Sequence, residues 1–337
     1  MKKLVSWVLL VSCVCCLSAR EFPLCLYGVS NPDDLKTIKK AGFSCIQSYV
    51  QEPQILEKLA QKAQKLGLKV VFYPNKIVAT SYEQKAQKWP VLAWYLVDEP
   101  DVHRWSREQV TKMHQTTKKV FPNHATALVI GQGRTHIPYY DIPDVMMMDW
   151  YPVPHLPLPS FGDNVRYTQE GLVQMHTPGH PLWGVVQIFD WKNFKQYRPD
   201  HDRVGRFPTA SEIRFMAYDG ILNGASGLFF FTFNHLQDPL PKSAPAYWAR
   251  VTGVVKELTK FKKIMEKGIP VVNPVDVRSP LLMKTWRYKG HTYSVLVNRS
   301  DQAQPVSPAL LTNAYKPLYG TVKAAQLPAY EVWILKK

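Results

Sequence analysis

The stretch that decides the fold is Trp94-Tyr95-Leu96-Val97-Asp98-Glu99-Pro100-Asp101. The apolar run over residues 91 to 97 is nearly continuous, which indicates a strand buried on both faces of a parallel sheet. Pro100 ends this strand, so Asp98 and Glu99 follow a buried segment directly. Ionised carboxylates are costly to bury without partners. We therefore expect these two side chains either to face a functional cavity or to pair with cations.

Seven similar apolar runs bring the number of candidate strands to eight, and most of them are separated by segments of helical periodicity. The eight candidates are Leu24–Val29, Ser44–Val50, Lys69–Tyr73, Val91–Val97, Ala125–Ile130, Val145–Trp150, Leu182–Phe189 and Gly227–Phe233. The capping-box pattern Ser106–Gln109 and the segment Thr209–Glu212 predict where two of the helices begin. Eight such units predict an α/β fold, a closed (β/α)8 TIM barrel. The alternative, an open doubly wound sheet, lacks a GxGxxG motif after the first strand.

The pattern changes after Gly268. Residues 269–337 contain short β-like runs at Leu281–Tyr288, Thr292–Asn298 and Ala329–Leu335, separated by Pro, Gly and Asn. Such runs are typical of a small antiparallel, sandwich-like β-domain. We therefore expect a barrel catalytic domain over residues 20–268, followed by a C-terminal β-domain over residues 269–337.

The first 19 residues have the order of a secretory signal. Lys2-Lys3 precede an apolar run that ends at Leu17, and the small residues Ser18-Ala19 follow. The run is too short to span a bilayer as a permanent helix. Leu10-Val11-Ser12-Cys13 also resembles a bacterial lipobox, whose Cys becomes lipidated. We expect a secreted, periplasmic or cell-envelope-attached protein, with membrane contact only through such a lipid anchor.

Beyond that segment only two cysteines remain, Cys25 and Cys45, and both lie in strand-like runs. Two thiols in the core are the expected arrangement; a bridge between adjacent strands is the alternative in an oxidising compartment. Beyond that segment the sequence contains no metal-ligand spacing such as CxxC or HExxH, so we expect no metal site.

The formal net charge is +16, or +14 once Lys2 and Lys3 are removed with the signal. A basic surface favours anionic partners, although lysines on amphipathic helices usually form a solvated face. Arg198, Arg203 and Arg206 lie in a polar insertion after the seventh strand, which is either solvated or binds an anionic sugar. The sequence has no nucleic-acid motif, and we expect no nucleic-acid partner.

If the barrel is correct, the residues that end its strands share one rim. Aromatic faces stack on the C–H surfaces of sugars and amides bind their hydroxyls, so a rim of this composition predicts a carbohydrate partner. The candidate substrate-binding residues are Tyr27, Tyr49, Tyr73, Trp150, Tyr151, Gln187, Trp191 and Asn234.

With these motifs the chain resembles clan-A glycoside hydrolases of the β-galactosidase-like group over residues 22–265. Those families end the fourth strand with Asn-Glu, often followed by Pro, and the matching Glu, here Glu99, would be the general acid/base; Asp98 replaces the Asn. Residues 208–231 resemble the seventh helix and eighth strand of that group, and the appended β-domain is similar too. The resemblance implies a hydrolase of glycosidic bonds that needs no cofactor, since water is its co-substrate.

One departure from the family pattern concerns the nucleophile, a Glu at the end of the seventh strand. This chain has Gln187-Ile188-Phe189-Asp190 there. Asp190 is one candidate for that role, Asp149 is a candidate base for an inverting reaction, and Asp98 is a third source of the second carboxylate. The carboxyl separation would distinguish retention, at about 5 to 5.5 Å, from inversion, at about 6.5 to 9.5 Å. The alternatives outside this chemistry are a non-catalytic carbohydrate-binding or cell-envelope protein and, more weakly, a lyase acting on uronic acids.

Overall fold

The computed structural model describes residues 21–134, 137–175, 177, 179–194, 205–235, 238–271, 279–310, 316–319 and 325–337. The expected export signal at residues 1–19 lies outside these ranges, as do Arg198 and Arg203.

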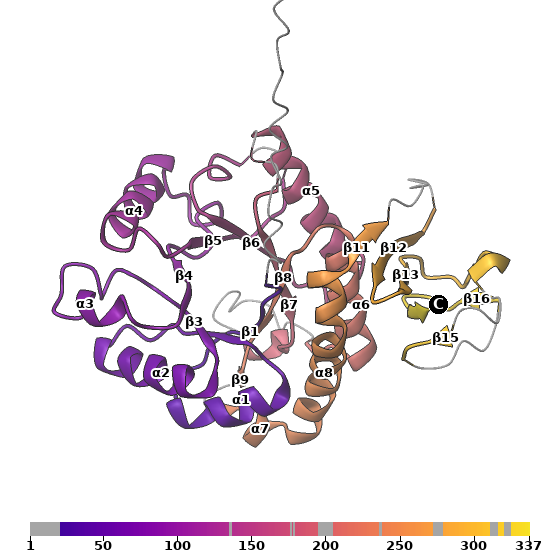
Figure 1. Ribbon diagram of the computed structural model, residues 1–337, viewed down its shortest axis with the longest axis horizontal. Helices are drawn as coiled ribbons and strands as arrows, with labels where there is room; N and C mark the ends of the chain where they lie inside the picture. The colour runs from indigo at the N-terminus through magenta and orange to yellow at the C-terminus, as the bar shows by residue number, and fades with distance from the viewer. Residues whose placement is uncertain are drawn as a thin grey trace, which may run out of the picture.

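Eight parallel strands form a closed barrel in which each strand pairs with the next and β8 pairs with β1 (Figure 1). The strands are β1 Leu24–Leu26, β2 Cys45–Gln47, β3 Lys69–Phe72, β4 Val91–Tyr95, β5 Thr126–Ile130, β6 Val145–Asp149, β7 Leu182–Gln187 and β8 Gly227–Phe231. All eight fall within the predicted runs, so the (β/α)8 fold is confirmed. Most of them end one to three residues earlier than predicted, which leaves their last polar and aromatic residues in the loops of the rim.

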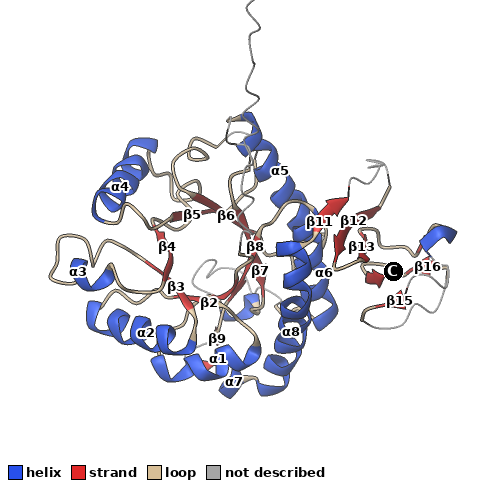
Figure 2. Ribbon diagram, in the orientation of Figure 1, coloured by secondary structure: helices blue, strands red, loops and turns tan. Residues whose placement is uncertain are grey.

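Helices surround this barrel on the outside (Figure 2). They are α1 Leu35–Ala41, α2 Pro53–Leu66, α3 Glu83–Ala86, α4 Arg107–Val120, α5 Ser160–Gln174, α6 Ala210–Leu222, α7 Leu240–Ser243 and α8 Pro245–Lys267. Two 3-10 turns, η1 Pro32–Asp34 and η2 Trp191–Asn193, lie in the connecting loops. After β8, the strands β9 Asn234–His235 and β10 Asp238–Pro239 pair in a short antiparallel ribbon. The capping boxes that open α4 and α6 form as predicted, at Ser106 and Thr209. None of the helices in the described residues is long and apolar enough to cross a membrane.

Side chains alternate along each barrel strand between two cores. On β6, Met147 belongs to the core inside the barrel, whereas Met146 and Met148 belong to the larger core between the strands and the helices. The period of two therefore places Asp149 on the inner side and Trp150 on the outer side of the strand end.

Cys25 and Cys45 form a disulfide, so the expectation of two free core thiols is wrong. The two residues are register partners on the neighbouring strands β1 and β2, and their Cα atoms are 4.4 Å apart. This separation lies at the lower end of the range that a disulfide can span. Both side chains point into the inner core, where no thiolate chemistry is accessible to solvent.

The C-terminal residues form an antiparallel sheet that packs beside α6 and α8 (Figure 1). The order of its strands is β11 Ile269–Val271, β12 Leu281–Tyr288, β13 His291–Asn298, β17 Val332–Lys336 and β15 Lys316–Pro317, and a separate ribbon pairs β14 Gln304–Pro305 with β16 Gln326–Leu327; η4 is Pro308–Leu310. Val295 and Ile334 on one face join the outer barrel core, while Leu296 and Leu335 on the other face pack with Leu327 of the ribbon. The sheet is therefore covered on both faces and shares a continuous core with the barrel.

Candidate active site

A pocket of about 760 Å³ lies at the carboxyl end of the barrel strands. Its described lining combines three carboxyl groups, one histidine, six aromatic rings and a few small or polar residues. These are Gly28, Ser30, Tyr49, Val50, Asp98, Glu99, His103, Asp149, Tyr151, Phe189, Trp191, Phe194, Phe231, Thr232 and Asn234. This is the face on which barrel enzymes carry their active sites.

The loop after β4 brings Asp98 and Glu99 into the pocket. It stays in register with β5, because Leu96 N–H donates to Ala127 O at 2.8 Å and Glu99 N–H donates to Val129 O at 3.1 Å. Glu99 has φ of +43°, in the left-handed region that non-glycine residues seldom adopt. Gly131, just after β5, leaves the space for this side chain, since a Cβ there would lie 2.9 Å from Glu99 Oε1. Sequence-distant residues thus hold Glu99 in an unusual position facing the pocket.

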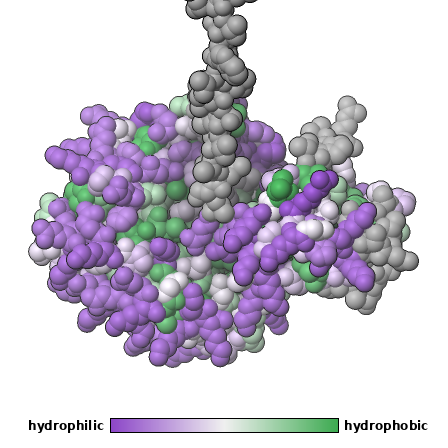
Figure 3. Space-filling model, in the orientation of Figure 1, coloured by the Kyte–Doolittle hydropathy of each residue, from purple (hydrophilic) through white to green (hydrophobic). Residues whose placement is uncertain are grey.

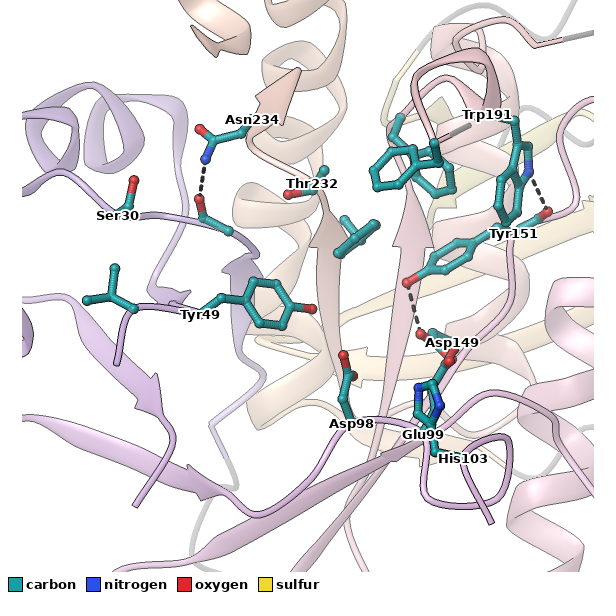
Figure 4. A pocket seen from close by; sticks show the side chains of 15 residues that line it. Ser30, Tyr49, Asp98, Glu99, His103, Asp149, Tyr151, Trp191, Thr232 and Asn234 are labelled. Carbon is teal, nitrogen blue, oxygen red and sulfur yellow. Dashed lines mark hydrogen bonds between the residues drawn. The ribbon is translucent and has the colours of Figure 1, made fainter. Parts of the chain in front are cut away.

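Asp149, at the end of β6, lies against Glu99 (Figure 4). It is only 7% exposed, and its Oδ2 accepts a hydrogen bond from the Tyr151 hydroxyl at 3.0 Å. Burial raises the pKa of Asp149 well above its usual range, and the negative charges of Glu99 and Asp98 raise it further. Burial and the charge of Asp98 also raise the pKa of Glu99. The two carboxyl groups therefore act as a pair that hydrogen-bonds through one shared proton.

Asp98 has a different environment. Burial raises its pKa, but the Tyr95 hydroxyl donates a hydrogen bond to its Oδ1 at 2.5 Å, and this bond favours the ionised form. The hydroxyls of Tyr27 and Tyr95 are themselves 3.3 Å apart and hydrogen-bonded. Burial and the Asp98 charge raise the pKa of both tyrosines well above 10, so their hydroxyls remain donors. The Tyr95 bond therefore opposes the effect of burial on Asp98, whose pKa remains raised overall.

Aromatic rings form one wall of the pocket. Tyr151 stacks on Phe231 with ring centroids 5.5 Å apart, and Phe189 and Trp191 pack edge-on against each other at 4.9 Å. The Trp191 indole N–H donates to Tyr151 O at 3.3 Å. Tyr49 and Asn234 come from the other side of the pocket in Figure 4. An aromatic wall facing carboxyl groups is suited to a sugar ring.

Four of the eight predicted substrate-binding residues line the pocket: Tyr49, Tyr151, Trp191 and Asn234. Tyr27 and Tyr73 instead lie beneath it as part of the inner core, where Tyr73 packs against Tyr95 with centroids 5.0 Å apart. The structure thus gives these two residues a supporting position rather than a place in the described lining.

Trp150 and Gln187 are also absent from the described lining. Trp150 packs in the outer core because it alternates with Asp149, and its indole N–H donates to Ser160 Oγ at 2.9 Å. Gln187 is fully buried, and its amide bonds both the N–H and the C=O of Val153, at 2.9 and 2.8 Å. It therefore anchors the loop after β6.

Asp190 does not join the other three carboxyl groups in the described lining. It is the N-cap of η2, where its Oδ1 accepts from Lys192 N–H at 2.8 Å. Its position fits a structural cap, and the structure does not bring it to Glu99 as a second carboxylate. Arg206, the described member of the arginine-rich insertion, pairs with Glu212 at 2.6 Å and is not part of the described lining either.

Sequence reasoning missed several contributors, among them Phe189 and Phe231 of the aromatic wall. His103 lines the pocket from the loop after β4, and its short distance in sequence from Pro100 could have suggested it. Tyr95 supports Asp98 from inside the barrel, and Phe194 extends the aromatic wall beyond η2. Neither of these two has a sequence signal of its own. Within the described residues, no group of three or more His, Cys, Asp and Glu side chains is placed to hold a metal ion.

No protein-family model and no curated protein matches the sequence. Solved structures of glycoside hydrolases match its fold. A GH30 endoxylanase from Clostridium papyrosolvens is 12% identical, with a TM-score of 0.54 over 94% of this chain and 96% of that one. A glycoside hydrolase family 5 protein from Bacteroides vulgatus is 12% identical, with a TM-score of 0.59 over 94% and 88%. Amy13B from Eubacterium rectale is 9% identical, with a TM-score of 0.60 over 95% and 96%.

At these identities the matches establish the fold alone. They cover nearly the whole chain, and the resemblance to glycoside hydrolase barrels with a C-terminal antiparallel sheet is confirmed at that level. The protein thus shares the barrel fold of these solved structures. Its reaction has to be argued from its own residues.

Proposed function

We propose that the protein hydrolyses glycosidic bonds at this pocket. The observation that carries the proposal is the pair of Glu99 and Asp149, two carboxyl groups with raised pKa that share a proton at the carboxyl end of the barrel, opposite an aromatic wall. A general acid must hold its proton near the working pH, and burial beside a like charge is how proteins achieve this.

In this proposal each carboxyl group has one role. Glu99 donates a proton to the leaving glycosidic oxygen, and Asp149, whose pKa the hydrogen bond to Glu99 raises, is the neighbour from which Glu99 receives that proton. Asp98, which accepts a hydrogen bond from Tyr95, is the second carboxylate. It acts at the anomeric carbon, either as the nucleophile or as the base that activates water. Water completes the hydrolysis, so no step requires a metal or an organic cofactor.

The non-catalytic alternative is favoured less. A binding protein gains nothing from two mutually repelling buried carboxyl groups, whose pairing costs free energy at neutral pH. A uronate lyase would want an Arg beside its base, and the described lining contains none.

The test is a screen of the purified full chain against oligosaccharides of varied linkage, with new reducing ends as the readout. Glu99→Gln is the paired negative control. For any cleaved substrate, NMR of the first product anomer determines retention or inversion. Equal cleavage by the wild type and Glu99→Gln would contradict the proposed roles.

We also propose that the protein is exported. The signal-like residues 1–19 support this, and so does the Cys25–Cys45 disulfide, since disulfides persist in oxidising compartments. Protein purified from the native cell should lack at least its first dozen residues when its N-terminus is determined by mass spectrometry. An intact Met1 would contradict export by cleavage, and a diacylglyceryl group on Cys13 would identify a lipoprotein.

A further inference from the structure

Exposed lysines gather on one side of the barrel, along α8 and at the neighbouring ends of α1 and α2. We call them the α8 lysine surface; they are Lys40, Lys65, Lys256, Lys260, Lys263 and Lys267. All six residues are exposed, and none of them takes part in an ion pair with another described residue. The three helices lie next to one another in Figure 1, and Figure 3 shows this side of the molecule as largely hydrophilic.

Contacts between the helices make this surface continuous. Thr259 of α8 donates a hydrogen bond to Gly42 O at 3.0 Å, just after the end of α1. Lys39 of α1 donates to the carbonyl of Gly67, the C-cap of α2, at 3.1 Å. The lysines at the ends of α1 and α2 therefore lie beside those of α8.

The lysines of α8 share one face of the helix. Lys256, Lys260, Lys263 and Lys267 follow one another at spacings of four, three and four residues. Like charges at such spacings destabilise a helix slightly. The helix dipole favours a lysine in the last turn, but Lys256 and Lys260 lie two or more turns before it. Helix stability thus does not account for this row of charges.

The acids of α8 do not balance the row. Glu257 turns toward α6 and pairs with Arg214 at 2.8 Å, and Glu266 accepts from Phe22 N–H at 2.8 Å. Their side chains are only 16% and 13% exposed, respectively. The outward face of this half of α8 therefore carries positive charge alone.

The described chain begins beside the α8 lysine surface. Phe22 is bonded to Glu266, and Lys262 Nζ lies 3.6 Å from Glu21 Oε1. Cys13, which the lipobox-like motif would lipidate, precedes Glu21 by eight residues, a length of chain that spans at most about 29 Å. A lipid on Cys13 would therefore hold this surface close to a membrane.

An exposed apolar side chain adjoins the lysines. Ile269, the first residue of β11, is 70% exposed, more than any other large apolar residue in the described ranges. It follows Lys267 by two residues and lies on an edge strand of the C-terminal sheet. Basic side chains beside an apolar one suit a lipid surface, which offers anionic headgroups over an apolar interior. A soluble polyanion offers only the charge.

We propose that the α8 lysine surface docks on an anionic phospholipid surface, with Ile269 entering the headgroup region. Anionic headgroups attract lysines over about a Debye length, which is about 10 Å at 0.1 M salt. This inference goes beyond the proposed hydrolysis and does not depend on it. The pocket lies at the carboxyl end of the barrel strands, whereas Phe22 leads into the amino end of β1, so docking leaves the pocket open to substrate.

The first experiment measures the sedimentation of residues 20–337 with lipid vesicles. The barrel and the C-terminal sheet pair within these residues, so the fold is retained without the apolar segment 1–19, which would bind lipid by itself. Phosphatidylcholine vesicles containing about 30% phosphatidylglycerol are compared with pure phosphatidylcholine at about 0.1 M salt. We expect at least about tenfold tighter binding to the anionic vesicles. Equal binding to the two compositions overturns the inference.

The second experiment locates the binding. The triple variant Lys256→Gln, Lys260→Gln, Lys263→Gln should bind the anionic vesicles at least about tenfold more weakly. The matched control, Lys88→Gln, Lys112→Gln, Lys119→Gln, removes the same charge from exposed lysines near α3 and on α4, across the barrel from α8 in Figure 1. It should lose less than about threefold. Equal losses by the two folded variants would assign the binding to net charge and remove the α8 lysine surface from it.

The third experiment distinguishes a lipid surface from a soluble polyanion. Ile269→Ser should bind the anionic vesicles at least about threefold more weakly, because less apolar area leaves water. Its binding to inorganic polyphosphate should equal that of the wild type, because the lysines are intact. Vesicle binding that Ile269→Ser leaves unchanged would contradict the lipid assignment and identify the surface as a site for soluble polyanions.

Discussion

Two groups of buried acids in this protein have opposite surroundings. At the junction between the barrel and the C-terminal sheet, Asp219 of α6 is fully buried, and Arg299 lies 2.9 Å from its Oδ1. Arg299 also bonds Asp163 at 2.9 Å and Pro159 O at 2.7 Å. In the pocket, Asp149 is almost equally buried, and its neighbours are two further carboxyl groups.

The contrast shows what a cation does for a buried acid. Burial raises the pKa of Asp219, and Arg299 opposes this, so that the pKa stands at about 7. Among the described residues no arginine or lysine pairs with Asp149, and its pKa is raised well above the usual range. The buried Asp219 therefore comes with an arginine, whereas the described lining of the pocket supplies no arginine or lysine to its acids. We regard this as the clearest physical mark of a functional site in the molecule.

The largest expected effect is at the junction. Arg299→Met should lower the free energy of unfolding by about 3 kcal/mol or more at pH 8, because it leaves Asp163 and Asp219 without their shared cation. Urea denaturation measures this. The matched control is Arg206→Met, which removes an exposed ion pair with Glu212 and should cost less than about 1 kcal/mol. Similar losses for the two variants would mean that burial does not distinguish the pairs.

The next effect is catalytic. Glu99→Gln should lower turnover at least about a hundredfold, which is about 2.7 kcal/mol in the barrier, because the amide cannot act as an acid. Asp190→Asn keeps a good N-cap for η2 and should stay within about twofold of the wild type. Near wild-type turnover by Glu99→Gln on a responsive glycoside removes this residue from the mechanism.

The predictable part of this protein is what periodicity and strand ends determine. All eight strands, the two capping boxes and the C-terminal sheet follow from local patterns, as does the placement of Asp98, Glu99 and Asp149 on one rim. The site predictions that failed depend on the direction in which a side chain points and on residues before or beyond the strand end, and the position of a strand end specifies neither. Trp150 turns outward because it comes one residue after Asp149, and two of the missed residues, Tyr95 and His103, lie before and beyond the strand end.

A third prediction compares two aspartates at the level of stability. The folded-state pKa of Asp149 is raised, so its favourable contribution to stability is complete below the unfolded pKa near 4 and is lost as pH rises through the folded value. Asp149→Asn should therefore raise the free energy of unfolding by about 1 kcal/mol at pH 8 and flatten its decline with pH.

Asp144 provides the opposite case. Bonds from Lys118 and Thr126 hold its pKa below the usual range, so its contribution is present above the unfolded pKa and is lost as pH falls through the folded value. Asp144→Asn should lower stability by less than about 1 kcal/mol at pH 8, because the side chain is 39% exposed and solvent screens its pairing with Lys118. If both substitutions shift the urea midpoint in the same direction, the distinction between paired and unpaired acids is wrong.

The smallest expected effect concerns salt. The basic composition predicts an anionic glycan, whose binding would weaken steeply as the Debye length falls from about 10 Å at 0.1 M to about 3 Å at 1 M salt. The described lining of the pocket contains no Lys or Arg side chain, and its aromatic wall predicts a neutral sugar, whose binding salt changes little. Affinity for a neutral oligosaccharide should then change by less than about threefold over this range. Calorimetric titration at the two salt concentrations measures it, with a uronate-bearing oligosaccharide as the comparison ligand. A uronate that binds more tightly than the neutral oligosaccharide at 0.1 M and loses tenfold or more at 1 M would show that the exterior, and not the pocket, selects the charge of the substrate.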